Sequence, residues 1–260
     1  MGRCIVVTSG KGGVGKSTIT ATLGMAIAGA GAKVALVDAD VGLNNLDLVL
    51  GIEDGVIYDV SDVEKGRCRL TEALVKHPFC ENLSLLSSRA LVSGQISERG
   101  FAAVIAALRR GFDYILIDCP AGIDEGFHRA VSAADEALIV TTPIPASVRD
   151  ADKVSDLLAG YRLRRVEVIV NRIRGDLVMK GEALGVADVR NVLRLPVVGS
   201  VPEDDEVLLS QTVGRIAKEE SAQYRAVLLV ASHIMMGTNT LYDCTAKYRG
   251  ILGFFRKMAR

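Results

Sequence analysis

The chain has 260 residues, 49% of them hydrophobic, and carries 31 basic and 31 acidic side chains. A chain of this length and composition can bury one large core, so we expect a single α/β domain rather than two small ones. The zero formal net charge argues against a protein that holds nucleic acid through its overall charge, so any electrostatic partner must bind a local patch.

The cysteines, histidines and apolar runs argue against several other classes of protein. The five cysteines are widely spaced and form no C-x-x-C pair, which indicates reduced thiols rather than a disulfide framework, a zinc site or an iron–sulfur cluster. The three histidines stand alone, and we predict no metal site from them. No run approaches about 18 apolar residues and no charged leader precedes the first strand, so we expect a protein that is neither secreted nor membrane-spanning.

The most informative stretch follows an apolar, β-branched run at residues 4–8 that predicts a strand. Residues 10–17 fit G-x-x-x-x-G-K-S/T, a phosphate-binding loop whose backbone N–H groups surround phosphate oxygens. In this pattern Lys16 binds the β- and γ-phosphates and the Ser17 hydroxyl binds Mg²⁺. A helix predicted at 17–30 would add its positive dipole end. The loop residues predicted to bind nucleotide are Gly10, Gly12, Gly13, Val14, Gly15, Lys16, Ser17 and Thr18.

The same glycines also match G-x-G-x-x-G, the fingerprint of dinucleotide sites, with the acidic Asp38 about twenty positions further on. A pyrophosphate between two sugars has no γ-phosphate or metal that would require Lys16 followed by two hydroxyls. The loop therefore favours a nucleoside triphosphate. A dinucleotide site and a glycine-rich turn without a ligand remain the alternatives.

The next element is an apolar strand predicted at residues 33–38, followed by a polar, glycine-broken stretch at 38–47. This stretch leaves the carboxyl end of the strand, where open α/β sheets bind ligands, so it can reach the phosphates. Further along we predict helices at 59–64 and 70–76, a strand at 83–86, and a helix at 97–110 with an apolar face of Phe101, Val104, Ile105 and Leu108.

Residues 112–118 form the second informative strand. Its apolar residues end in Asp118, which is the form of a Walker B strand whose carboxylate holds a metal-bound water, and residues 120–122 can turn sharply beside the γ-phosphate. The alternative is an aspartate that caps the following helix. Strands predicted at 136–142, 165–171 and 196–201 then alternate with helices at 147–160, 186–193, 203–211 and 217–236. This alternation predicts a mostly parallel sheet with helices on both faces.

The last residues differ from the rest of the chain. A polar stretch at 237–246 predicts a linker after a main domain at 1–236, and residues 247–260 carry five basic side chains and no acid. On a helix the apolar side chains of 247–260 share one face, which favours a helix on a membrane surface, the alternative being a last helix that docks on the sheet. The residues predicted to contact the membrane are Tyr248, Ile251, Leu252, Phe254, Phe255 and Met258.

Four segments and this tail together resemble the ParA/MinD family of ATPases with the deviant Walker A motif, over essentially the whole chain. The segments are 11–18, 38–47, 118–122 and 149–152. The resemblance implies a single-domain P-loop NTPase that uses ATP and Mg²⁺, with Lys11 reaching the phosphates of a partner in a nucleotide-sandwich dimer. It further implies Lys11, Lys16 and Asp40 as catalytic residues, with Asp40 positioning the attacking water. It places Ser17, Asp40 and Asp118 at the metal. The adenine-binding loops would be Asn171 with Arg172, and the stretch of Pro202, Glu203 and Asp204.

Within that family the resemblance is to the septum-site-determining members. It implies an ATPase that dimerises with ATP, binds an anionic membrane at the inner face of the cell membrane, and recruits a MinC-like division inhibitor. A MinE-like topological factor would stimulate hydrolysis and release the protein, and Asp152 would contact a partner protein. No specific nucleic acid is implied. Ser17 stands where threonine is commoner, but it keeps the hydroxyl that Mg²⁺ requires.

Three other functions, known from related proteins, are the alternatives to this one. A flagellar-number ATPase would share the motifs and the tail, and the sequence separates it poorly. A DNA-partition ATPase would be expected to carry a basic face, and an iron–sulfur carrier would need cysteines spaced to bridge a cluster, which this chain does not have.

Overall fold

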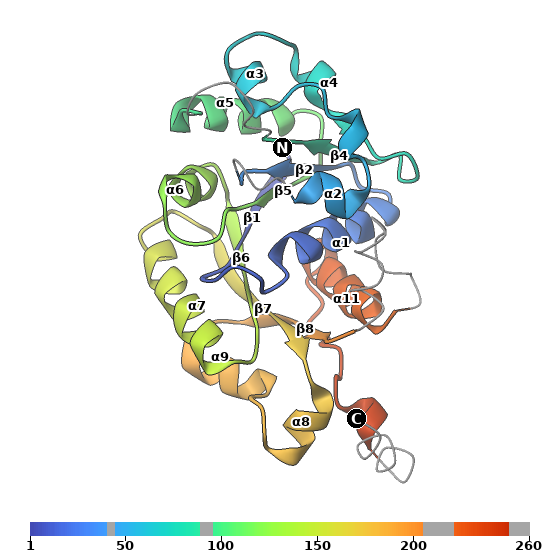
Figure 1. Ribbon diagram of the computed structural model, residues 1–260, viewed down its shortest axis with the longest axis vertical. Coiled ribbons are helices and arrows are strands. Elements are labelled where there is room, and N and C mark those ends of the chain that lie inside the picture. Colours follow the sequence, from blue (N-terminus) through green and yellow to red (C-terminus); the bar gives the residue numbers. More distant parts are fainter. Residues whose placement is uncertain (41–44, 89–95, 205–220, 250–260) are drawn as a thin grey trace.

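The computed structural model describes residues 1–40, 45–88, 96–204 and 221–249. A central sheet runs through the described part, with strand order β3-β4-β2-β5-β1-β6-β7-β8 and every neighbouring pair parallel except β3 and β4 (Figure 1). The strands are β1 (Arg3–Thr8), β2 (Val34–Asp38), β3 (Val75–Lys76), β4 (Leu83–Leu86), β5 (Tyr114–Asp118), β6 (Glu136–Thr141), β7 (Arg165–Ile173) and β8 (Val197–Pro202). This architecture confirms the predicted α/β fold.

Helices cover both faces of the sheet. The helices that cover the sheet are α1 (Lys16–Gly29), α2 (Leu46–Leu50), α3 (Val60–Glu64), α5 (Glu98–Leu108), α6 (Glu125–Ser132), α7 (Pro145–Leu158), α9 (Val186–Leu193) and α11 (Ala222–Met236). The other described helices are α4 (Leu70–Ala73), α8 (Gly175–Lys180) and the 3₁₀ turns η1 (Glu53–Gly55) and η2 (Ala246–Tyr248). Helices α3, α5, α6, α7 and α9 pack on one face, and α1, α2 and α11 on the other. No helix among the described residues is long and apolar enough to cross a membrane.

The apolar runs in the sequence reflect this two-sided burial. Successive strand residues point to opposite faces, so Cys4 and Val6 of β1 join one layer of the core while Ile5 and Val7 join the other. Both layers are covered by helices, which is why the inner strands carry apolar residues at consecutive positions. The predicted apolar face of the helix at 97–110 is likewise buried in α5.

Several elements differ from the sequence predictions. Helices α2, α6 and α8 were not predicted, and two other elements have different bounds. The helix predicted at 70–76 ends at Ala73, because Val75 and Lys76 pair with β4 as a short antiparallel edge strand. Strand β7 runs past Asn171 to Ile173, which pairs with β8 after a shift in register. Residues 205–211 and 217–220 of two predicted helices lie outside the described residues, and α11 begins after Ser221, whose Oγ accepts a hydrogen bond from the Tyr224 N–H at 3.0 Å.

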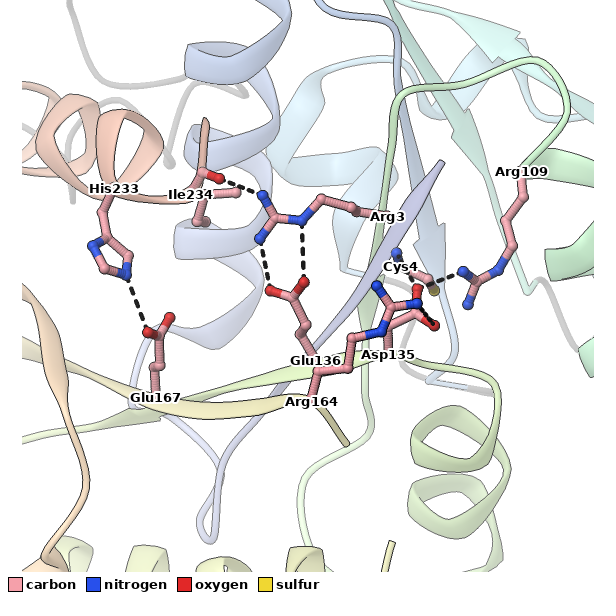
Figure 2. A network of polar contacts seen from close by, with 9 residues as sticks. All are labelled: Arg3, Cys4, Arg109, Asp135, Glu136, Arg164, Glu167, His233 and Ile234. Atoms are coloured by element: carbon pink, nitrogen blue, oxygen red, sulfur yellow. Dashed lines mark hydrogen bonds and ion pairs between the residues drawn. The ribbon is translucent and has the colours of Figure 1, made fainter. Parts of the chain in front are cut away.

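Charged side chains form a network at the edge where the parallel strands begin (Figure 2). Arg3 donates to both carboxylate oxygens of Glu136, at 3.1 and 2.7 Å, and to the carbonyl oxygen of Ile234. Asp135 accepts a hydrogen bond from Arg109 in the same network. These contacts tie the starts of β1 and β6 to the C-terminal end of α11 and to the residue that follows α5.

Residues 237–249, here named the C-terminal segment, pack on the domain. Cys244 and Tyr248 are only 6% and 4% exposed, and Tyr248 ends the η2 turn next to Gly175 of α8. The burial of Tyr248 corrects its assignment to the membrane-facing residues, since packing its ring on α8 removes apolar surface from water. The other predicted membrane residues, Ile251, Leu252, Phe254, Phe255 and Met258, lie outside the described residues.

Candidate functional site

The glycine-rich loop between β1 and α1 lies at the carboxyl edge of the sheet. Gly13 and Gly15 have φ values of 79° and 89°, a left-handed conformation that side chains disfavour. A Cβ at Gly10 would lie 2.3 Å from the backbone oxygen of Asp150 in α7, so the loop passes directly against that helix. A Cβ at Gly12 or Gly13 would meet open space, which leaves the loop backbone accessible to a ligand.

Lys16 and Ser17 converge on Asp118 at the tip of β5. Lys16 Nζ lies 2.7 Å from Asp118 Oδ1, and the Ser17 hydroxyl donates to Asp118 Oδ2 at 2.6 Å. Both Lys16 and Asp118 are buried, at 8% and 1% exposure, so the pair is poorly screened by solvent. The buried hydroxyl of Thr20 lies 3.1 Å from Asp118 Oδ1 and 3.0 Å from the carbonyl oxygen of Lys16. Thr20 was not predicted, although its position one helical turn after Lys16 places it on the same face.

A second carboxylate, Asp38, lies beside Asp118 because the two end neighbouring, register-paired strands. Asp38 Oδ1 accepts a hydrogen bond from the Asp40 N–H at 2.9 Å, and Oδ2 accepts one from Leu46 at 3.3 Å. Burial raises the pKa of the Asp38 carboxyl to about 7, and the charge of Asp118 adds to this effect. The sequence places Asp38 at a strand end and in the alternative dinucleotide fingerprint, but not beside Asp118. The two carboxylate oxygens of Asp38 therefore hold the backbone at Asp40 and at Leu46.

Asp40 lies at the entrance of a cavity of about 370 Å³ on the same edge of the sheet. Burial raises the pKa of its carboxyl, and the positive charge of Lys16 opposes that rise. The cavity is also lined by Ile96, Pro120, Asp124, Glu125 and Arg129. Residues 41–44, the continuation of the predicted loop, lie outside the described residues.

Asn171, predicted to contact adenine, reaches the phosphate-binding loop itself. Its Nδ2 donates to the carbonyl oxygen of Val14 at 2.8 Å, and the side chain is 3% exposed. A Cβ at Gly15 would lie 2.4 Å from this Nδ2, so only glycine leaves room for the amide. The next residue, Arg172, is exposed and has a left-handed φ of 56°, which costs energy in a residue other than glycine and occurs most often at functional sites.

A second cavity, of about 390 Å³, opens beside the loop. One wall comes from Lys11, Gly12, Gly13 and Val14. The other walls come from the ends of β6, β7 and β8 and from α8, and include Ile144, Arg172, Arg174, Leu177 and Glu203. Since the loop would hold phosphates, the walls that face it are placed for the nucleoside, with apolar surface for a base and charged groups around it.

The other predicted residues are distributed unevenly around this cavity. Lys11 is exposed at its rim, and Asp152 lies on α7, partly exposed. Pro202 is buried at the end of β8, and Asp204 accepts a hydrogen bond from the Gln223 N–H at 3.5 Å; neither is among the described residues that line the cavity. Glu203, which belongs to the predicted adenine-binding stretch 202–204, does line it. Arg174 and Leu177 line it as well and were not predicted, because their only sequence signal is that they follow a strand whose end the sequence did not define.

The donor set fits a Mg–nucleotide complex. A serine hydroxyl and a carboxylate are hard oxygen ligands of the kind that Mg²⁺ takes together with phosphates and water. The open backbone at Gly12 and Gly13 leaves room for phosphate oxygens next to Lys16. In the ranges that the structure describes, no group of three or more histidine, cysteine, aspartate or glutamate side chains could hold a metal ion without such phosphates.

Comparison with known proteins agrees with this geometry. The family model "CobQ/CobB/MinD/ParA nucleotide binding domain" matches residues 5–215. The septum site-determining protein MinD of Thermotoga maritima is 45% identical over 82% of this chain and 80% of its own length. A putative septum site-determining protein MinD of Oltmannsiellopsis viridis is 43% identical over 98% of this chain and 82% of its own length.

Solved structures show the same relationship. MinD in the MinC:MinD complex of Aquifex aeolicus superposes with a TM-score of 0.85 at 40% identity, covering 92% of this chain and 97% of the other. The MinD of Pyrococcus horikoshii in complex with Mg-ADP gives a TM-score of 0.79 at 32% identity, covering 91% and 97%. The phosphate-binding loop, the Walker B carboxylate and the similarity to known proteins all indicate the same family. The chain belongs to the MinD group of septum site-determining ATPases within the CobQ/CobB/MinD/ParA nucleotide-binding family.

Proposed function

We propose that this ATPase acts as a nucleotide-controlled switch in the placement of the division site. With ATP it dimerises, binds the inner face of the cell membrane from the cytoplasm, and recruits a MinC-like division inhibitor. A MinE-like factor stimulates hydrolysis and releases it. The observation that carries this proposal is that Lys11, which belongs to the phosphate-binding loop, is exposed at the rim of the nucleotide cavity, where a second subunit could meet it.

Hydrolysis requires the parts that converge on Asp118. Bound Mg²⁺ would neutralise charge that develops on the phosphates, with Ser17 and Asp118 holding it. Lys16 would exchange its contact with Asp118 for the phosphates. Asp40 is partly exposed and its backbone N–H is held by Asp38, so we assign to Asp40 the orientation of the attacking water.

A second copy of the chain would complete the site. The dimer places Lys11 of each subunit on the phosphates of the other, and this charge stabilises the transition state in trans. The cavity that Asp40 lines is also lined by Asp124, Glu125 and Arg129, and we propose that these charged groups contact the second copy.

Recruitment of an inhibitor is supported by similarity. The Aquifex aeolicus relative forms a MinC:MinD complex, and this chain is 40% identical to its MinD. We propose that a MinC-like protein binds this chain at a surface that includes Asp152 on α7. Because α7 also contacts the phosphate-binding loop at Gly10, nucleotide state and partner binding would involve the same helix.

Membrane binding is assigned to residues 250–260 with the basic residues next to them. One short amphipathic helix binds weakly because ordering it in water costs much of the energy that its apolar side chains contribute. A dimer presents two such helices, and the second insertion is intramolecular, which raises avidity by about 10²–10⁴ without a new contact.

Sedimentation with anionic liposomes tests this function. We expect the wild type to sediment with ATP and to stay in solution with ADP, and we expect Phe255→Glu to stay in solution with both while binding ATP normally. Gly253→Glu is the matched control, because it adds the same charge two positions from Phe255, which is the opposite side of the predicted helix. Equal sedimentation in ATP and ADP would disprove the switch.

A further inference from the structure

The C-terminal segment is packed on the short helix that forms one wall of the nucleotide cavity. A Cβ at Gly175, the first residue of α8, would lie 2.0 Å from the carbonyl oxygen of Cys244 and 3.1 Å from Cε2 of Tyr248. The Cys244 thiol also lies 3.3 Å from the Ser200 hydroxyl of β8. The backbone at Cys244 therefore packs directly on Gly175, at a distance that leaves no room for a side chain between them. In Figure 1 the η2 turn, near the C-terminal end, lies beside α8.

The other side of the same helix start faces the nucleotide cavity. Arg174, which immediately precedes Gly175, lines that cavity together with Leu177 of α8. The guanidinium of Arg174 is held by Asp176 at 2.7 and 3.0 Å and lies 3.7 Å from Glu203, which lines the cavity as well. The cavity wall and the surface that receives Tyr248 are therefore formed by consecutive residues, Arg174 and Gly175.

We propose that Tyr248 is a positioning residue of the nucleotide site: by packing on Gly175 it holds α8 where Arg174 and Leu177 complete the wall opposite the phosphate-binding loop. The side chain does not line the cavity and acts through α8. Binding energies are reciprocal between linked sites, so a nucleotide that contacts this wall also stabilises the docked C-terminal segment. The inference rests on nucleotide binding in this cavity and does not require the membrane role of the tail.

The test uses the full-length chain without lipid and Mg-ADP as the ligand, which avoids ATP-dependent association. We expect Tyr248→Ala to raise the Kd for ADP about five- to twentyfold, within the range of typical couplings between sites. Tyr248→Phe should stay within about twofold of the wild type, because the ring and not the hydroxyl packs on Gly175. The turnover number at saturating ATP should change little, so that the loss appears in KM and not in kcat.

A second variant separates positioning from loss of stability. Gly175→Ala inserts a methyl group against the Cys244 carbonyl and should also raise the Kd for ADP, and the double variant with Tyr248→Ala should lose less than the product of the two effects, since both break one contact. Asn239→Ala, at an exposed position of the same segment, is the control and should bind ADP normally. Melting temperatures recorded in parallel identify any variant that is not folded.

Unchanged ADP affinity in folded Tyr248→Ala and Gly175→Ala proteins would overturn the proposal. So would an equal loss in Tyr248→Phe, or fully independent losses in the double variant. Liposome binding is not measured in this assay. If the protein does not bind membranes, the ADP affinities still test the role of Tyr248, and if Tyr248 has no role, the membrane function is still open to its own test. Hydrogen exchange at residues 244–248 gives the reciprocal measurement and should slow when ADP is added.

Discussion

At the scale of single residues, the two lysines of the phosphate-binding loop have opposite environments. Lys16 is buried against Asp118, whereas Lys11 is exposed. We therefore expect Lys16→Ala to lose nucleotide binding within its own subunit, and Lys11→Ala to keep binding while losing hydrolysis, because its charge acts on the partner's site. Equilibrium binding of a fluorescent ATP analogue and phosphate release measure the two losses separately.

Mixing these two variants gives the decisive control. A mixed dimer contains one site with its own Lys16 and the partner's Lys11, so part of the activity should return. If Lys11→Ala hydrolyses ATP at the wild-type rate, the assignment of this lysine to the partner's phosphates is wrong.

The second prediction concerns Asp40. We expect Asp40→Asn to bind ATP with nearly normal affinity and to hydrolyse it at least about 100-fold more slowly, because only the orientation of water in the transition state is lost. Glu125→Gln, on the same cavity, is the matched neutralisation and should retain most of the unstimulated activity. A parallel loss of ATP affinity and turnover in Asp40→Asn would instead assign this carboxylate to ground-state binding.

The sequence predicts the phosphate contacts better than the nucleoside contacts, for a physical reason. Phosphate binding depends on backbone conformation, so glycine spacing and one lysine indicate it directly. Asp38, Thr20 and Arg174 reach the site through strand register and packing between distant elements, which one sequence does not encode as a local pattern. Asn171 was predicted from family resemblance, but its hydrogen bond to the Val14 carbonyl becomes visible only when β7 lies beside the loop.

At the scale of elements too, local patterns were predicted from the sequence and contacts between distant elements were not. Buried strands such as β1 and β5 were predicted because both faces are covered and their central positions are consecutively apolar. The short edge strand β3, the extension of β7 and the docking of the C-terminal segment were not, since each depends on a contact made by a neighbouring element. Tyr248 is an example: helical spacing assigns it to an apolar face that would contact a membrane, but in the structure its ring is buried against the domain.

The network at the amino edge of the sheet gives a prediction at this scale (Figure 2). Burial raises the pKa of Asp135, but hydrogen bonds from Arg109 and the Cys4 N–H and the charges of Arg109 and Arg164 outweigh burial and hold the pKa below its usual value. The unfolded chain therefore binds a proton more readily than the folded one, so the stabilisation is present above about pH 4 and is lost on further acidification.

We expect Asp135→Asn to lower the free energy of unfolding by about 1–3 kcal/mol at pH 7, measured by urea denaturation. The difference between variant and wild type should shrink as the pH falls below about 4, where the wild-type carboxyl gains its proton. Asp156→Asn, at an exposed position of α7, is the control for the charge change. A difference that is constant from pH 7 to pH 3 would contradict the ionic origin of the effect.

At the scale of the whole molecule, the two edges of the sheet have different tasks. At the amino edge, partly buried charge pairs hold the strands and α11 together. The carboxyl edge carries the phosphate-binding loop, Asp38, Asp40 and Asp118. The C-terminal segment starts at α11, near the amino edge, and ends against α8, beside the nucleotide cavity. A tail that leaves the domain at this point is well placed to follow the nucleotide state.

The proposed switch is a change of oligomeric state, so the mass of the protein in solution tests it most directly. Asp40→Ala, which should slow hydrolysis, is to be measured by sedimentation equilibrium with Mg-ATP and with Mg-ADP, without lipid. We predict twice the monomer mass in ATP and the monomer mass in ADP, with the ATP-dependent dimer lost when Lys11→Ala is added. The same mass in both nucleotides would contradict the account.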